Sequence, residues 1–257
     1  MILKFDPHFH SKYSDGADSV LDIERKCQML NISVILTDHN EIKGSLELYE
    51  RGRVPTLFGI EAGTKEGIEF LIYFKNIEEY IFFYKSQIES YKYSRFVSRL
   101  KNSAYNILEC ANTLETFISL AHPYAYGKKS VLHHEKNNYL LDHVYKNIDA
   151  IEVYNGTLSI NRNHQAFELW QKSGKKFTIG SDGHNIKYLG TTYLEIEKEN
   201  NFDSDIFFDK FRNNDYLKAM KNSPVNRLRT LTTISRKHTG FFLTRANLFN
   251  TIKKAWF

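Results

Sequence analysis

Short apolar runs recur along the chain, and each is followed by a polar or helix-patterned stretch. The runs are too short for helices, are rich in β-branched and aromatic residues, and lack a clean alternation of apolar and polar positions. Strands that are buried on both faces of a parallel sheet have this pattern. The pattern predicts seven strands, Ile2–Phe5, Val34–Leu36, Thr56–Ile60, Phe70–Phe74, Phe117–Ala121, Ala150–Tyr154 and Phe177–Gly180.

Helical periodicity lies between these runs. Ser19 is the expected N-cap of a helix with apolar residues at helical spacing, and a second such pattern covers Glu78–Leu100. A third predicted helix, Ile160–Lys172, lies between a capping Ser159 and a terminating Gly174. Alternation of strand and helix over about seven units predicts an α/β fold, a closed or nearly closed TIM-like β/α barrel.

Two parts of the chain depart from the alternation. The stretch Pro123–Asn147 has no strong period, which predicts an insertion over the mouth of the barrel. After an expected extra strand at Thr191–Glu197 the pattern loosens, and Phe241–Phe257 has the periodicity of a terminal helix with an apolar face that docks on the domain. We therefore predict a barrel over residues 1–197 and a C-terminal extension, residues 198–257, that packs on it.

The extension carries most of the positive charge. Residues 201–257 hold 11 Lys and Arg against 4 Asp and Glu, whereas the first 200 residues hold 24 against 26, from chain totals of 35 and 30. A basic tail behind a neutral body is typical of a polyanionic partner, and a solubilising surface is the equal alternative. No apolar stretch approaches the ~20 residues of a membrane span. With two cysteines of unpartnered spacing, Cys27 and Cys110, the sequence predicts a cytoplasmic protein without a membrane partner.

Metal-ligating residue types follow five of the seven predicted strands, at their C-terminal ends, which form one rim of a β/α barrel. Nitrogen and oxygen donors without thiolates favour Zn, Mn or Fe. So many ligands exceed the needs of one ion, and we predict two or three divalent ions with Glu61 as a bridge. The candidate ligands are His8, His10, Asp15, His39, Glu61, His122, Asp182 and His184.

These residues stand in motifs that follow one another in a fixed order. The motifs are Asp6-Pro-His8-Phe-His10-Ser-Lys-Tyr-Ser-Asp15-Gly, Thr37-Asp38-His39-Asn, Gly59-Ile-Glu61, Ala121-His122-Pro123, Asp149-Ala-Ile-Glu-Val-Tyr-Asn155-Gly and Gly180-Ser-Asp182-Gly-His184. Over residues 1 to 197 the chain resembles the PHP (polymerase and histidinol phosphatase) family. The resemblance implies a distorted seven-stranded β/α barrel, a trinuclear metal centre and phosphoesterase activity.

The same resemblance distributes the candidate ligands among three ions. It implies His8, His10, Glu61 and Asp182 at the first ion, Glu61 and His122 at the second, and Asp15, His39 and His184 at the third. Asp15, within Ser-Asp-Gly, resembles the branch with nucleotide phosphatases and 5′-to-3′ exonucleases that act on short RNA. The family often supplies a further His to the second ion, whereas this chain has only Glu69 nearby; a solvated Glu69 and a weaker second ion are the favoured interpretation.

The predicted reaction is hydrolysis of a nucleotide or a short single-stranded oligonucleotide by a metal-activated water at a di- or trinuclear centre. His122, His184 and Asp182 are the catalytic candidates, and His184 or His122 would assist proton transfer. Arg162, Lys128 and Lys129 are candidates for binding phosphate, against the alternative that each is a solvated surface charge.

Three alternatives remain open from the residues alone. A small-molecule phosphomonoesterase would use the same centre. A metal-dependent amidohydrolase also has HxH on its first strand, but no lysine stands at a strand end here and the Ser-Asp-Gly and Asp-Gly-His elements stay unexplained. A domain that binds nucleic acid without turnover is disfavoured, because ligands are costly to keep in a fold without a metal.

Overall fold

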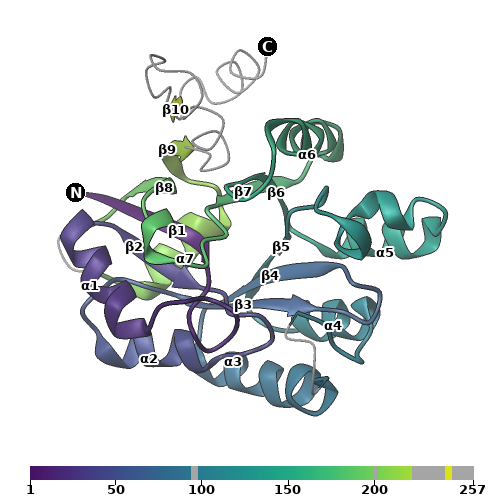
Figure 1. Ribbon diagram of the computed structural model, residues 1–257, viewed down its shortest axis with the longest axis horizontal. Coiled ribbons are helices and arrows are strands. Elements are labelled where there is room, and N and C mark those ends of the chain that lie inside the picture. Colours follow the sequence, from purple (N-terminus) through teal and green to yellow (C-terminus); the bar gives the residue numbers. More distant parts are fainter. Residues whose placement is uncertain (94–97, 200–201, 222–240, 245–257) are drawn as a thin grey trace.

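The computed structural model describes residues 1–93, 98–199, 202–221 and 241–244, and these residues form ten strands in two five-stranded sheets (Figure 1). The first sheet has the order β10-β9-β8-β1-β2, with the strands β1 (Ile2–Phe9), β2 (Ser33–Leu36), β8 (Thr192–Glu197), β9 (Tyr216–Lys221) and β10 (Phe241–Thr244). The second has the order β3-β4-β5-β6-β7, with the strands β3 (Phe58–Gly63), β4 (Glu69–Phe74), β5 (Thr116–Leu120), β6 (Ala150–Asn155) and β7 (Lys176–Gly180).

All seven predicted strands form, as does the extra strand β8, and the mixed α/β class is confirmed. The closed seven-stranded barrel is not what the described residues form, because the two sheets meet only at the isolated bridges Phe9–Gly183 and His39–Glu61. Nor is the arrangement parallel throughout, since β4 runs antiparallel to β3 and β5. Residues 64–68 are too few for the crossover that a parallel neighbour of β3 needs, so the chain makes a hairpin instead.

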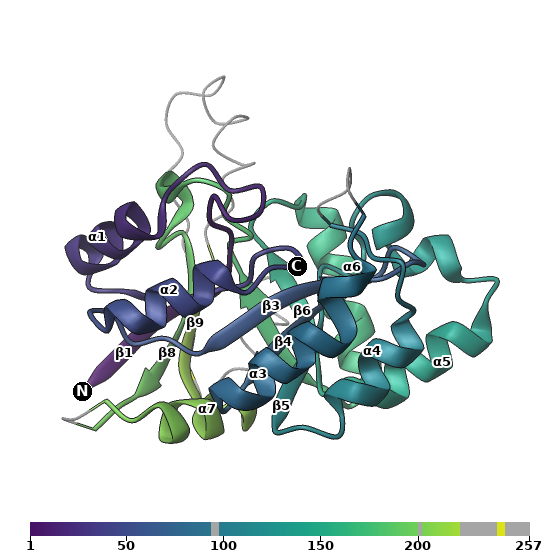
Figure 2. The same cartoon turned by 90° about the horizontal axis from the view of Figure 1, so that it is seen from below.

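Helices cover the outside of both sheets, with α1 and α2 beside β2 and α4, α5 and α6 along the second sheet (Figures 1 and 2). Their bounds are α1 Val20–Leu30, α2 Lys43–Arg51, α3 Ile77–Phe83, α4 Ala104–Ala111, α5 Asn138–Asn147, α6 Ile160–Ser173 and α7 Ser204–Arg212. Ser19 caps α1 as predicted, accepting a hydrogen bond from the Asp22 amide, and Gly174 ends α6 in the left-handed conformation. The predicted helix from Glu78 is shorter than expected, passing after α3 into a π-turn at Tyr84–Ile88.

The stretch after His122 is more ordered than the sequence indicated. It contains two 3-10 turns, Gly127–Lys129 and Val131–His134, before α5. In α5 only Leu140 and Val144 are buried, so the helical period is short and the sequence pattern does not reveal it.

The core is filled by aromatic side chains that join the first sheet to the second. Phe5 of β1 packs edge-on against Phe207 and Phe211 of α7, with ring centroids 4.9 and 5.3 Å apart. Tyr73 and Phe117 of the second sheet pack against the same Phe211. These contacts fix the angle between the sheets, and with it the edge where β1, β2, β3 and β7 end together.

Beyond residue 197 the chain continues into the first sheet, where β9 pairs with β8 and β10 with β9. The predicted terminal helix at Phe241–Phe257 is wrong over Phe241–Thr244, which form β10, and its remainder lies outside the described residues. The division at residue 197 stays a prediction. Within the described part of the chain, every helix is too short or too polar to cross a lipid bilayer.

Candidate metal centre

All eight predicted ligands lie together at one edge of the two sheets, where strands end. His8 is the penultimate residue of β1, and Glu61 lies inside β3. The others follow β1, β2, β5 and β7 within a few residues. They are His10, Asp15, His39, His122, Asp182 and His184.

The donor atoms of four of these side chains converge, and five of the distances between them are known. The Nε2 atoms of His8 and His10 lie 3.2 Å apart. From Glu61 Oε2 they lie 3.5 and 3.3 Å away, and from Asp182 Oδ1 3.4 and 3.1 Å. Nitrogen and oxygen ligands that stand about 2.0–2.2 Å from a zinc ion are about 3.3–3.6 Å from one another in a tetrahedron. The donor atoms therefore fit a divalent cation at their centre.

The hydrogen bonding of the group also fits a cation. His8 Nδ1 lies 2.8 Å from Glu152 Oε1, and because a carboxylate only accepts, Nδ1 carries the proton and Nε2 keeps its lone pair for the group. Glu61 Oε2 is buried among three imidazole nitrogens, those of His8, His10 and His39, yet receives no well-aligned hydrogen bond. A buried carboxylate oxygen in this state costs free energy unless a cation compensates it.

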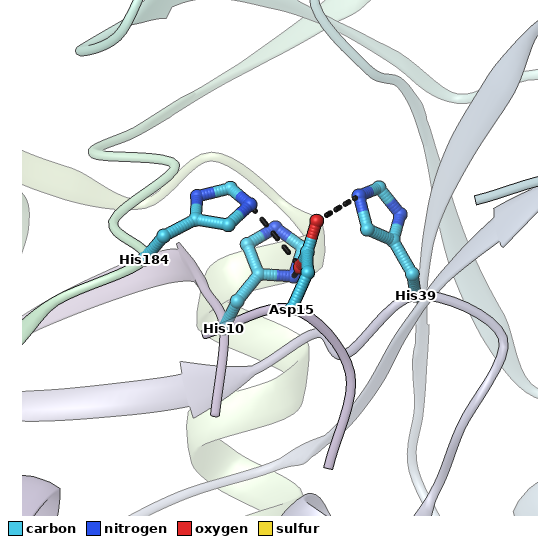
Figure 3. Close-up of side chains that lie close together, drawn as sticks. All are labelled: His10, Asp15, His39 and His184. Atoms are coloured by element: carbon cyan, nitrogen blue, oxygen red, sulfur yellow. Dashed lines mark ion pairs between the residues drawn. The ribbon is translucent and has the colours of Figure 1, made fainter. Parts of the chain in front are cut away.

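Asp15 brings a second group together. Its carboxylate lies between the rings of His184 and His39, with His184 Nε2 3.2 Å from Oδ1 and His39 Nε2 3.6 Å from Oδ2 (Figure 3). His10 Nδ1 lies 3.8 Å from the same Oδ1. The Nδ1 of His184 donates to the backbone carbonyl of Asp182, 2.9 Å away, which leaves Nε2 as the free donor atom toward Asp15. These four side chains have donor atoms close enough to share one ion.

Glu69 belongs to the centre, and the interpretation of a solvated side chain is wrong. It opens β4, and the antiparallel register places it opposite Gly63, two residues beyond Glu61, so that Glu61 and Glu69 project from the same face. Its side chain is fully buried, with Oε2 3.3 Å from His122 Nε2 and Oε1 3.8 Å from His39 Nδ1. Only the hairpin, which the sequence did not predict, brings the start of β4 to this edge.

Polar side chains outside the candidate ligand set hydrogen-bond to the ligands and to the loops that carry them. Glu152, besides binding His8, accepts hydrogen bonds from the backbone amide of His122 and from Asn155 Nδ2. Asp38 orders the loop that carries Asp15, because its carboxylate accepts from the amide of Ser11 and from Ser14 Oγ at 2.7 and 2.6 Å. Sequence reasoning missed both roles, although both acids lie within quoted motifs and Asp38 directly precedes the candidate ligand His39.

The backbone is strained at two of the candidate ligands. His122 and Asp182 have φ values of 25° and 51°, in the left-handed region that non-glycine residues seldom adopt. Strained residues of this kind concentrate at functional sites, where the surrounding structure imposes them. At Asp182 the constraint includes the hydrogen bond from its amide to the carbonyl of His8, 2.9 Å away.

Electrostatics separate the two glutamates of the centre. Burial favours the neutral form of Glu61, but the electrostatic interaction of its carboxylate with the His39 and His8 rings outweighs burial and holds the pKa of Glu61 well below its ordinary value. Burial raises the pKa of Glu69, and the neighbouring charge of Glu61 raises it further. For His39, burial lowers the pKa, but Glu61 and Glu69 together bring it up to about 9. The buried carboxylates therefore make the centre electrostatically favourable for cations.

The three phosphate-binding candidates occupy different places. Arg162 is not a solvated charge, since its guanidinium donates to the carbonyls of Tyr124 and Ala125 and lies 3.7 Å from the ring centre of Tyr126. Lys129 Nζ lies 2.7 Å from Glu69 Oε2, inside the centre. The carbonyl of Lys128 lies 2.9 Å from Nε2 of His134, and no contact of its ammonium group with the centre is seen in the described structure.

Comparison with protein families gives two adjoining matches. The PHP domain matches residues 6–163, and the PHP-associated segment matches residues 161–216. No curated protein matches the chain.

Three solved structures share the fold. The lesion-specific endonuclease PfuEndoQ from Pyrococcus furiosus is 17% identical, with a TM-score of 0.65, and covers 99% of this chain and 71% of its own. Endonuclease Q in complex with a 27-mer duplex substrate that has an abasic lesion at the active site is 16% identical, with a TM-score of 0.63 over 98% and 72%. A two-domain protein from Bacteroides vulgatus, containing a predicted PHP-like metal-dependent phosphoesterase, is 14% identical, with a TM-score of 0.60 over 99% and 70%.

Proposed function

This chain belongs to the PHP family, and we propose that it hydrolyses phosphate esters, cleaving a nucleotide or a short single-stranded oligonucleotide at a centre of two or three divalent ions. The convergence of Glu61 and Asp182 on His8 and His10 carries the proposal, because the spacing of their donor atoms suits a divalent cation. Divalent ions bind phosphate oxygens, lower the pKa of a bound water and stabilise the charge that develops on the attacking and leaving oxygens.

The protein side chains have separate tasks in this proposal. His8, His10, Glu61, Asp182 and the group around Asp15 hold the ions in place. The Glu152 carboxylate fixes the tautomer and the ring orientation of His8.

Of the two histidines considered for proton transfer, His184 is the better suited. Its side chain is 35% exposed, so it can exchange a proton with solvent at the edge of the centre. His122 is buried and already lies 2.9 Å from Glu61 Oε1, so its ring has no direct exchange of protons with solvent. Asp182, the remaining catalytic candidate, lies between His10 and Asn155, whose Nδ2 donates a hydrogen bond to its carboxylate.

Two features support a nucleotide or oligonucleotide as the substrate. Ser14-Asp15-Gly16 resembles the nucleotide-acting branch of the family, and the structure orders this loop through Asp38. Residues 201–257 carry a surplus of seven positive charges, 11 against 4. Endonuclease Q, which shares the fold, has been solved with a DNA duplex. The cytoplasm as the compartment stays a prediction from the sequence.

A substrate panel tests the proposal. Chain stripped with a chelator and reloaded separately with Mn, Fe or Zn is assayed on mononucleotides, single-stranded oligonucleotides, an abasic duplex, sugar phosphates and an amide. Hydrolysis of the nucleotide or single-stranded substrates at the highest kcat/KM supports the proposal. Preference for sugar phosphates would identify a small-molecule phosphomonoesterase, and preference for the amide an amidohydrolase. Metal binding without turnover of any substrate would contradict an enzymatic role.

A further inference from the structure

One corner of the centre, formed by Glu61, Glu69 and His122, contains the ammonium group of Lys129. Glu69 Oε2 lies 2.7 Å from Lys129 Nζ and 3.3 Å from His122 Nε2, while the same His122 nitrogen lies 2.9 Å from Glu61 Oε1. The carboxylates of Glu61 and Glu69 are fully buried, whereas the Lys129 side chain is 35% exposed and reaches in from the edge.

This corner differs from the group around His8 and His10. In that group every converging atom is a potential ligand, and the spacings of 3.1–3.5 Å are those of ligands around a shared cation. His39, Glu61 and Glu69 also have donor atoms close enough to share an ion. At Glu69, however, the shortest distance joins a carboxylate oxygen to an ammonium, a close ion pair, and neither Glu69 oxygen receives a well-aligned hydrogen bond. Two buried carboxylates need a compensating charge, and Lys129 supplies one without any ion.

The position of Lys129 is built into the fold. It ends the 3-10 turn Gly127–Lys129, which follows His122 in the chain and is tied back by a hydrogen bond from the Val131 amide to the Pro123 carbonyl, 2.8 Å. The turn is seated against the β3–β4 hairpin at Gly67, where a Cβ would come within 2.6 Å of Lys128 Cβ. Gly67 has φ +100°, so a residue with a side chain would be strained as well as obstructed.

We propose that the ammonium of Lys129 replaces a metal ion at the corner of Glu61, Glu69 and His122, so that this chain holds two divalent ions and supplies the third positive charge itself. A divalent ion at this corner would stand within a few ångströms of the ammonium, and like charges in a buried site repel strongly. The inference rests on the proposed metal centre, and it makes Glu69 the ion-pair partner of Lys129 and not a metal ligand.

Counting metal ions tests the inference without reference to activity. Wild-type chain and variants are loaded with excess Mn²⁺, freed of loosely bound metal, and measured by elemental analysis, with circular dichroism to verify folding. Wild type should hold about two equivalents, and Lys129→Met about three, because Glu69 and His122 then become available to a further ion. The matched control Lys128→Met removes the same charge one residue earlier and should leave the count at about two, as should the charge-retaining Lys129→Arg.

Glu69→Gln provides a second measurement should Lys129→Met fail to fold. If Lys129 replaces the ion, loss of the Glu69 carboxylate leaves the count unchanged at about two, whereas a metal-ligating Glu69 would lose about one equivalent. Three equivalents in wild type, an unchanged count in a folded Lys129→Met, or a loss in Glu69→Gln would each overturn the inference. Wild type and all variants without metal would instead contradict the proposed function itself.

Discussion

His39 and Glu61 lie side by side where the two sheets meet. A single parallel bridge joins their backbones between β2 and β3, and His39 Nδ1 lies 2.9 Å from Glu61 Oε2. The same pair thus connects the two sheets and belongs to the candidate metal centre. His39 directs its other nitrogen toward Asp15, while Glu61 directs its other oxygen toward His122. A change at Glu61 should therefore affect more than one metal position.

The first prediction follows from this sharing. Glu61→Gln should remove more than one equivalent of metal, because Glu61 contacts both the His8–His10 group and His39 of the group around Asp15, whereas His39→Ala should remove about one. Elemental analysis of protein purified without chelator gives both numbers. Full metal retention by the Glu61 variant would show that this carboxylate does not bridge.

The second prediction concerns catalysis. Asp182→Asn and His10→Ala should each abolish phosphate-ester hydrolysis, since both side chains belong to the candidate ligand group of His8, His10 and Asp182. The circular-dichroism spectrum should stay that of wild type, because these residues lie at the ends of strands and not in the aromatic core. A folded variant that keeps more than about a tenth of the wild-type rate would place the active site elsewhere.

The third prediction concerns the support of His8. Glu152→Gln should weaken metal binding about 10–100-fold while leaving all proposed ligands in place, because the amide no longer holds the Nδ1 proton of His8 as a carboxylate does. Titration of the metal-free variant with Mn²⁺ measures the change. Glu168→Gln, on the solvent side of α6, is the matched control and should bind metal as wild type does. Equal affinities in the two variants would remove Glu152 from this role.

The fourth prediction concerns Asp6, which is fully buried behind His8. Burial raises the pKa of its carboxyl to about 7, although hydrogen bonds from Ser181 and His8 favour the charged form. A pKa raised on folding gives stability that is present below the unfolded value of about 4 and is lost as the pH rises through 7.

Asp6→Asn replaces the titrating carboxyl with a neutral amide. In chelator-treated protein, the free energy of unfolding of the variant should therefore increase relative to that of wild type as the pH rises from 4 to 7. The relative increase should be at most about 4 kcal/mol and should stay constant above pH 7. Urea unfolding at a series of pH values measures the difference. A difference that does not vary with pH would show that Asp6 titrates normally in the folded chain.

The last prediction tests four basic residues of the C-terminal extension that lie outside the described residues. If they follow a single-stranded backbone, log Kd should vary with log salt at a slope of about 0.7 per phosphate contacted. Neutralising Arg227, Arg229, Arg236 and Lys237 should flatten that slope and spare hydrolysis of a mononucleotide. Filter binding across a salt series measures it. An unchanged slope would favour a small phosphomonoester as the substrate.

The sequence by itself determined the strands and the residue types that end them. Buried strands need continuous apolar runs, and such runs are visible in the sequence whatever the arrangement of the sheets. The ligand types after β1, β2, β3, β5 and β7 were visible for the same reason, because a strand end fixes where a side chain emerges. Their common edge followed from the expectation that the strands run parallel, which holds for most of them.

Only the tertiary structure decided which further groups enter the centre. The direction of β4 depends on a five-residue connection between Gly63 and Glu69, and reversing it moves Glu69 from the far edge to a place beside Glu61. Lys129 reaches Glu69 because its turn is seated on Gly67, and Glu152 reaches His8 across 144 residues of chain. Such contacts depend on how elements pack against one another, a long-range property that local periodicity does not encode.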